Sequence, residues 1–258
     1  MINDTGPETN DDDAVFRFGR ENLPSNVLAK RELKEYYDRF YGKSEFKYYD
    51  ERTARRFLHT LLKKAQVPPC ATILDVGCGT GFYSEQLRIM GFRPFGLDIS
   101  HVGLQKGRLQ YPSLPLTVGD ASIMPFKAGS FDAVFISGCS LTNTRDLLSI
   151  QDYITGLTEY AKDNGAVVFV GGSNFTGGTA ENSEWISHRY EEILQFVNRE
   201  KVDVGGPYVT NFRLLSKFGN LVLNKSFSSV ARRLPGDRRW SLVYYIRKKV
   251  NRQIFSRP

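Results

Sequence analysis

The sequence predicts an α/β fold in which helices cover both faces of a mostly parallel sheet. Residues 73–81, Ile-Leu-Asp-Val-Gly-Cys-Gly-Thr-Gly, are an apolar run that ends in alternating glycines. This pattern is typical of a buried strand that turns sharply into a helix. Strand-like and helical segments then alternate through the middle of the chain. With 258 residues, 41% of them hydrophobic, the chain is long enough to bury the core of such a domain.

The glycines of this first turn predict a ligand site. Gly77, Gly79 and Gly81 leave backbone N–H groups accessible at the start of the next helix, where the helix dipole favours a carboxylate or phosphate. Dinucleotide-binding turns space their glycines as G-x-G-x-x-G, but Phe82 occupies the third glycine position here. Taken alone, the glycines are also compatible with a tight turn that binds nothing.

Acidic or small residues follow each of the next strands. These strands are 93–97 before Asp98, 114–118 before Gly119-Asp120-Ala121, and 131–136 before Ser137-Gly138. The carboxylate of Asp98 is well placed to accept hydrogen bonds from two ribose hydroxyls. A helix cap is the alternative for Asp98, although Ser100 already suits that role. For Asp120, the alternative is an ordinary turn.

Together, these four motifs resemble class I S-adenosylmethionine (SAM)-dependent methyltransferases over about residues 70–171. Within this family, the sequences of the motifs are most similar to those of the small-molecule branch, which is typified by ubiquinone-biosynthesis enzymes. The resemblance implies a Rossmann-like, seven-stranded sheet of order 3-2-1-4-5-7-6 with an antiparallel last strand. It also implies SAM as methyl donor and S-adenosylhomocysteine (SAH) as product.

The resemblance further implies which residues bind the cofactor. The ribose would be bound by Asp98, and Ile99 would pack on the adenine ring. The remaining cofactor contacts would be Asp75 with the backbone of Gly77, Cys78, Gly79 and Gly81 at the methionine end, Asp120 and Ala121 at the adenine edge, and Ser137 and Gly138 beside the sulfonium.

The segment before the first strand is expected to cover this site. Residues 1–25 are polar and acidic and are expected to be disordered. Residues 26–69 are expected to form a helical lid that includes an amphipathic helix capped by Asp50. Within this lid, Tyr37 and Tyr41 are expected to reach the substrate, and the alternative is that their rings cover the edge of the sheet.

The rest of the chain is expected to complete a methyltransferase domain over residues 70–250. The predicted elements are a helix over 147–162, a fifth strand over 166–170, a helical insertion over about 184–222, and a terminal hairpin of strands 227–233 and 240–247. Residues 251–258 are expected to form a basic tail.

Positive charge is concentrated at the C-terminus. Residues 225–258 carry ten Lys and Arg against one acid, a net charge of +9, although the whole chain carries only +7. In the hairpin turn, Arg232 and Arg233 are expected at the carboxyl end of the sheet, where they would bind an anionic small substrate. A solvated turn is one alternative, and RNA or protein methylation that uses this basic region is another.

A hydroxyl acceptor would need a base, and His188 is the candidate among three histidines. Glu181 and Glu184 are fallback bases. The cysteines Cys70, Cys78 and Cys139 lack metal-ligand spacing and are interpreted as packing residues. No metal is therefore expected.

Sequence composition restricts the remaining possibilities. Acidic residues in the first thirteen positions argue against a secretory signal or mitochondrial presequence, and no apolar run reaches membrane length. A cytoplasmic monomer or homodimer is expected. A noncatalytic subunit of the same fold and a dehydrogenase are the alternative functional classes.

Overall fold

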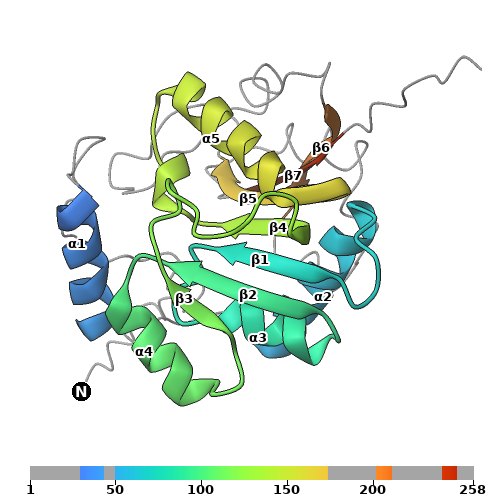
Figure 1. Ribbon diagram of the computed structural model, residues 1–258. Coiled ribbons are helices and arrows are strands. Elements are labelled where there is room, and N and C mark those ends of the chain that lie inside the picture. Colours follow the sequence, from blue (N-terminus) through green and yellow to red (C-terminus); the bar gives the residue numbers. More distant parts are fainter. Residues whose placement is uncertain (1–29, 44–49, 174–201, 211–239, 249–258) are drawn as a thin grey trace, which may run out of the picture.

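The computed structural model describes residues 30–43, 50–173, 202–210 and 240–248 (Figure 1). Their strands form one seven-stranded sheet of order β3-β2-β1-β4-β5-β7-β6, as predicted. The strands are β1 (Thr72–Val76), β2 (Arg93–Asp98), β3 (Leu116–Val118), β4 (Phe131–Ser137), β5 (Ala161–Ser173), β6 (Val202–Thr210) and β7 (Trp240–Lys248). The strands from β3 to β5 pair in parallel, and β7 is antiparallel to both of its neighbours.

The helices divide the core into two layers, one on each face of the sheet. These helices are α1 (Lys30–Lys43), α2 (Glu51–Lys64), α3 (Phe82–Ile89), α4 (His101–Gln110), α5 (Leu147–Tyr160) and the short η2 (Ser140–Thr142). In β1, Leu74 and Val76 face the cluster that includes α5, whereas Ile73 faces the cluster formed with α2 and α3. This alternation along the strand is what a sheet buried on both sides requires.

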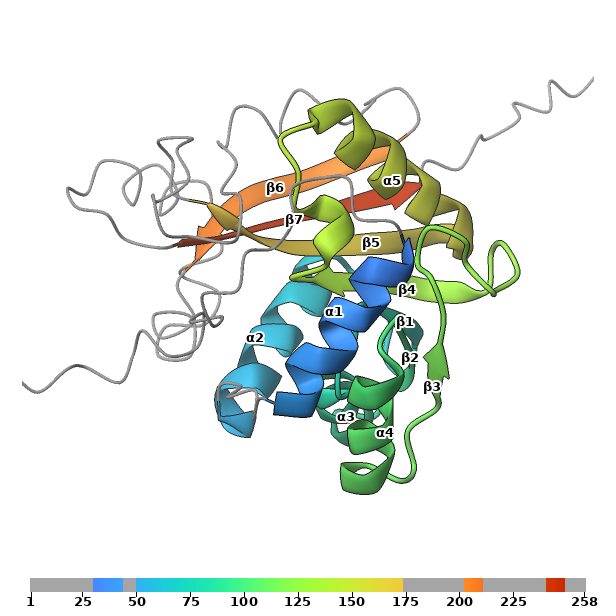
Figure 2. The same cartoon turned by 90° about the vertical axis from the view of Figure 1, so that its left-hand side faces the viewer.

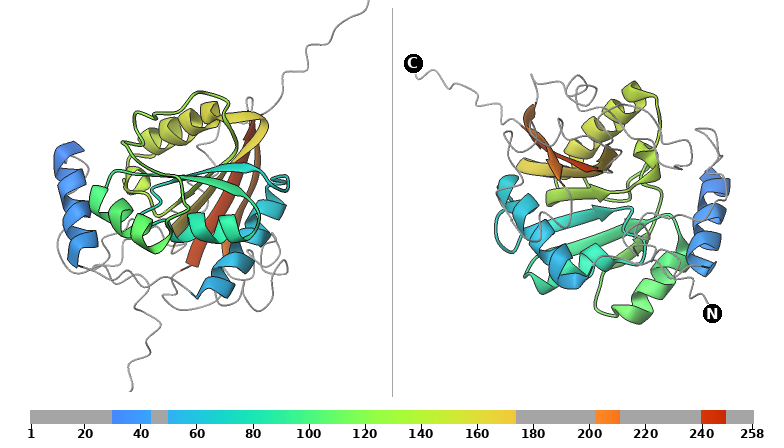
Figure 3. Two further views of the ribbon diagram at one scale, coloured as in Figure 1. Left: turned by 60° about the horizontal axis from the view of Figure 1, so that its bottom comes forward. Right: turned by 180° about the vertical axis from the view of Figure 1, so that it is seen from behind.

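The two N-terminal helices have different roles. In α2, the side chain of Asp50 accepts the Thr53 N–H as the predicted cap, and Phe57 and Leu61 are fully or almost fully buried against the sheet. This helix is therefore part of the core layer, not part of a lid. In contrast, α1 lies outside these layers and runs alongside α4 (Figures 2 and 3).

Around β5, the element boundaries differ from the sequence prediction. The helix α5 ends at Tyr160, and the strand begins at Ala161, which pairs with Phe131. Residues 163–165, which separate the predicted helix from the predicted strand, form an irregularity inside this strand, where Asn164 has a φ of +63°. The third strand is also shorter than predicted, because Leu114 closes a turn with Tyr111 and pairing begins only at Leu116.

The predicted hairpin partner of β7 is wrong. The neighbour of β7 is β6, Val202–Thr210, and residues 227–233 lie outside the described part of the chain. The sequence Gly205-Gly206-Pro207 had the composition of a turn, but it forms a bulge in an edge strand, where proline is tolerated. At Gly205, a Cβ would lie 1.9 Å from the Tyr245 ring, so glycine is required for this pairing.

The prediction of a helical insertion over residues 184–222 is also wrong, because the strand β6 lies within this range. The flanking residues 174–201 and 211–239, which include the predicted helices and the loop after Ser173, lie outside the described residues. Pairing of Thr210 with Ser241 places both ends of the 211–239 connection at the carboxyl edge of the parallel strands. Arg247 lies at the opposite end, where its side chain donates to the Gln66 side chain and to the Asn164 carbonyl.

Among the residues that the structure describes, no helix has the length and apolar character needed to span a membrane.

Candidate functional site

The glycine turn between β1 and α3 has the backbone conformation that its sequence predicts. Gly77, Gly79 and Gly81 have φ angles of +72°, +58° and +82°, in the left-handed region that favours glycine. The N–H groups of Gly77 and Cys78 both donate to the Leu97 carbonyl, at 2.8 and 3.1 Å. These bonds fix the turn against the end of β2.

Asp98 connects this turn to the start of α4. One carboxylate oxygen accepts the Gly79 N–H and the other accepts the Ser100 N–H, both at 2.8 Å. The side chain is buried, and burial raises its pKa, whereas the two amide hydrogen bonds oppose that shift. A carboxylate offers about four acceptor positions, so Asp98 keeps acceptor capacity for a ligand hydroxyl.

Asp75 lies behind the turn. Its carboxyl group is buried and accepts the Ser84 hydroxyl at 2.7 Å. Burial raises its pKa to about 7, and the nearby charge of Asp98 adds to the shift. Asp75 does not line the pocket described next, so its direct contact with a ligand stays a prediction.

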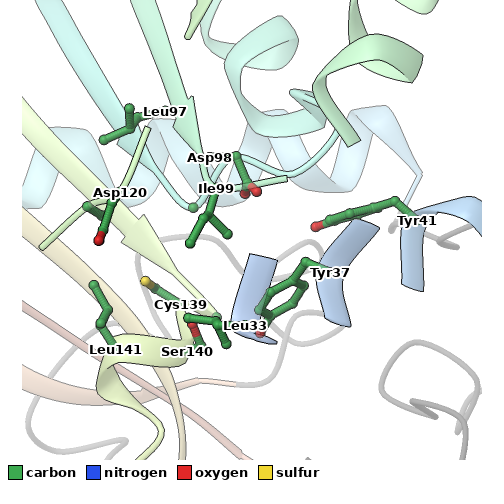
Figure 4. Close-up of a pocket in the computed structure, with 13 residues that line it drawn as sticks. Leu33, Tyr37, Tyr41, Leu97, Asp98, Ile99, Asp120, Cys139, Ser140 and Leu141 are labelled. Carbon is green, nitrogen blue, oxygen red and sulfur yellow. The ribbon is translucent and has the colours of Figure 1, made fainter. Parts of the chain in front are cut away.

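A pocket lies at the carboxyl ends of the parallel strands and under α1 (Figure 4). It has about 500 Å³ of empty space, part of which is open to solvent. The pocket is lined by Leu33, Tyr37, Tyr41, Gly77, Leu97, Asp98, Ile99, Asp120, Ala121, Gly138, Cys139, Ser140 and Leu141.

The pocket brings together eight residues that the sequence singled out. These are Tyr37, Tyr41, Gly77, Asp98, Ile99, Asp120, Ala121 and Gly138. Five others are near the turn or the strand ends without lining the pocket: Asp75, Cys78, Gly79, Gly81 and Ser137. His188, Arg232 and Arg233 lie outside the described residues.

Sequence reasoning missed the pocket residues that follow Gly138. Ser140 and Leu141 come directly after the fourth strand, and that position was the available signal. Leu33 was missed because a single leucine in an amphipathic helix does not reveal which surface it faces. Cys139 was expected only as a packing residue, and it is both buried and part of the pocket wall.

Two titratable side chains of the pocket wall, Cys139 and Tyr37, favour their neutral forms. Burial raises the pKa of the Cys139 thiol to about 11, so at neutral pH it is not a nucleophilic thiolate. Burial also raises the pKa of the Tyr37 phenol, and the nearby Cys139 and Asp98 add to that shift, whereas a hydrogen bond with the Ser140 side chain opposes it. Tyr37 is therefore available as a hydrogen-bonding group, not as a base.

In the described part of the chain, no group of three or more His, Cys, Asp or Glu side chains is arranged to hold a metal ion.

Comparison with known proteins agrees with this geometry. Residues 73–165 match the family model described as a methyltransferase domain. Demethylmenaquinone methyltransferase of Streptomyces avermitilis is 37% identical over 109 residues, which are 41% of this chain and 44% of that protein. The 18S rRNA (guanine(1575)-N(7))-methyltransferase of Saccharomyces cerevisiae is 36% identical over 101 residues, 36% of this chain and 37% of that protein.

A similar fold is found in a solved SAM-dependent methyltransferase from Clostridium acetobutylicum. It has a TM-score of 0.55 and 12% identity, and the match covers 85% of this chain and 99% of that one. The chain spans less than half the length of the curated relatives reported above.

The sheet order and the pocket at the strand ends define a Rossmann-like domain of the class I methyltransferase type. The family match assigns residues 73–165 within that fold to a methyltransferase domain, in agreement with the resemblance seen in the sequence.

Proposed function

We propose that this chain binds SAM in the pocket and transfers its methyl group to an oxygen atom of a small, anionic acceptor. The observation that carries the proposal is the convergence of Gly77, Asp98 and Asp120 on one pocket, from three different strand ends. Such convergence at the carboxyl edge is where open α/β sheets bind ligands.

The chemistry of the pocket lining supports binding of a nucleoside with a polar, partly charged tail. Asp98 would accept ribose hydroxyls, and Ile99 would pack on the adenine. The Asp120 backbone and side chain already fix a turn, through bonds from Ile123 N–H at 2.9 Å and Ser122 N–H at 2.8 Å, so the adenine edge would meet a preformed surface.

The glycine turn would accommodate the methionine end. A Cβ on Gly77 would lie 3.4 Å from the Cys139 Cβ, so the absent side chain leaves space between the turn and the fourth strand. The turn backbone would bind the carboxylate of the ligand, with Asp75 holding the turn from behind through Ser84. Ser137 and Gly138 would border the reacting end.

When bound, SAM supplies a methyl group on a sulfonium, which is electrophilic without further activation. The protein then has to orient the acceptor and remove its proton. No histidine lines the pocket among the described residues, and the neutral Tyr37 and Cys139 are poor bases. We therefore propose His188 as the base that removes this proton.

The anionic character of the acceptor is inferred from the connection between β6 and β7. Both of its ends lie at the carboxyl edge, and it contains Arg232 and Arg233. Guanidinium groups at that edge would bind a carboxylate or phosphate.

Ligand binding tests the cofactor assignment directly. SAM and SAH should raise the melting temperature, and at a ligand concentration of 100 times Kd the stabilisation is about 2.7 kcal/mol. NAD should not, which separates the methyltransferase from a dehydrogenase. A melting temperature that SAH does not change would refute the proposal.

The base assignment has its own test. His188→Ala should lower turnover by orders of magnitude and leave SAH affinity unchanged, because His188 is assigned to the acceptor. Unchanged turnover would remove His188 from the mechanism.

The acceptor itself can be identified from the methylated products that form when cell extract is incubated with the protein and labelled SAM.

A second candidate, methylation of RNA, is favoured by the yeast rRNA methyltransferase relative and by the basic C-terminal region. RNA binding that falls steeply with salt would support this candidate. Absence of RNA binding at low salt would exclude it.

A further inference from the structure

The carboxylate of Asp38 fixes α1 to the first turn of α4. Its Oδ1 accepts the Ser100 hydroxyl at 2.7 Å and the Val102 N–H at 3.0 Å, and its Oδ2 accepts the Lys34 ammonium group at 2.5 Å. A negative charge at a helix N-terminus also interacts favourably with the helix dipole. Asp38 thus joins segments that are more than sixty residues apart in the sequence.

These bonds continue into the pocket. Ser100, which donates its hydroxyl to Asp38, also donates its N–H to Asp98. Asp98 in turn accepts the Gly79 N–H of the glycine turn. A continuous chain of hydrogen bonds therefore runs from α1, through the proposed ribose-binding carboxylate, to the turn.

A second contact fixes the C-terminal end of α1. The ring of Tyr41 packs directly on Gly103 of α4, where a Cβ would lie only 2.8 Å from the ring. The Lys106 ammonium group donates to the Tyr41 carbonyl. With the C-terminal half of α1 fixed at Asp38 and Tyr41, the Tyr41 side chain points toward Asp98 and the Tyr37 side chain points toward Ser140 in the pocket (Figure 4).

We propose that Asp38 is a positioning residue that docks α1 onto α4 and thereby closes Tyr37 and Tyr41 over the nucleoside. This inference rests on the proposed function. Because the ligand and the docked helix share one pocket, the apparent affinity falls in proportion to the fraction of molecules with α1 docked.

The first test compares substitutions within α1 by calorimetric titration with SAH. Asp38→Ala should weaken binding about tenfold or more, since it removes two hydrogen bonds to a charged acceptor. Asp38→Asn keeps an oxygen for Ser100 and Val102 and should recover most of the affinity. Glu35→Ala is the matched control, because Glu35 is exposed and its ion pair within the described residues is with Arg31 of the same helix.

A second measurement separates positioning from general destabilisation. Asp38→Ala should increase hydrogen exchange of residues 30–43 without ligand, whereas exchange in β1 and β4 should not change. Gly103→Ala should act in the same way, because its methyl group meets the Tyr41 ring although alanine is the better helix former in α4. The melting temperature without ligand should fall only slightly in either variant, because undocking of α1 leaves the two core layers packed.

The effect of Asp38 should also depend on the tyrosines. In a Tyr37→Ala, Tyr41→Ala background, Asp38→Ala should weaken SAH binding by a smaller factor than it does in the wild type, because the effects of residues that act together are not additive. Full additivity, or normal SAH affinity in Asp38→Ala, would overturn the inference. If the wild-type protein itself did not bind SAH, the proposed function would fail, and the inference with it.

Discussion

The contact between α4 and the glycine turn provides a sharp test of the site. Gly107 of α4 lies against the turn so closely that a Cβ would be 2.4 Å from the Thr80 carbonyl oxygen and 2.9 Å from Leu116. Cβ atoms essentially never approach other atoms within 3.0 Å, so Gly107→Ala requires the Thr80 backbone and α4 to separate by at least about 0.6 Å. This displacement would move the turn that is proposed to bind the cofactor.

The magnitude follows from comparison with Gly156 of α5, where nothing lies within 4 Å of the added Cβ. Replacement of glycine by alanine stabilises the helix by up to about 1 kcal/mol in both Gly107→Ala and Gly156→Ala. Only Gly107→Ala incurs an overpacking cost, of about 1–3 kcal/mol. Gly107→Ala should therefore be less stable than Gly156→Ala by about 1–3 kcal/mol, or about 2–12 °C in melting temperature.

The assays are urea unfolding and calorimetric titration with SAH for both variants. Gly156→Ala should bind SAH like the wild type, whereas Gly107→Ala should bind at least about tenfold more weakly because the turn is displaced. Equal stability of the two variants, together with equal affinity, would show that α4 does not press on the Thr80 carbonyl and would refute the reasoning.

Three further predictions concern the buried titratable groups. Asp98→Asn should weaken SAH binding about tenfold to a hundredfold in calorimetry, since it removes a charged acceptor from the ribose site; unchanged affinity would remove Asp98 from that role. The pKa of Asp75 is raised in the folded state, so its contribution to stability is fully present below about pH 4 and is lost as pH rises towards 7. The free energy of unfolding of Asp75→Asn relative to wild type should therefore increase over that range, and a pH-independent difference would contradict the shift. At pH 7.5, iodoacetamide should label the exposed Cys70 and leave Cys139 unmodified until the protein unfolds, as read by mass spectrometry; rapid labelling of Cys139 in the folded protein would contradict its raised pKa.

The sequence was most informative where local pattern and fold agree. The strand-to-turn transition at residues 73–81 requires glycine for backbone reasons, so its conformation could be predicted without a structure. The acidic residue at the end of β2 could also be located, because parallel strands bring their carboxyl ends to one edge.

Prediction failed where a contact between distant residues decides the structure. Gly205-Gly206-Pro207 has the composition of a turn, and only the Tyr245 ring lying on Gly205 explains why it belongs to a strand. The role of Asp38 was equally hidden. A carboxylate four residues after Lys34 suggests a local ion pair, whereas its bonds to Ser100 and Val102 depend on how α1 docks.

The position of the pocket residues along the sequence has a consequence for how the acceptor specificity of such a protein can be altered. Every lining residue in the described part of the chain lies between Leu33 and Leu141, and the family match ends at residue 165, before β6 and β7 begin. On the proposed function, the described residues that would recognise the nucleoside therefore lie apart in the sequence from β6 and β7. Exchange of the segment after Ser173 for that of a relative could alter which molecule is modified while the donor half is inherited intact.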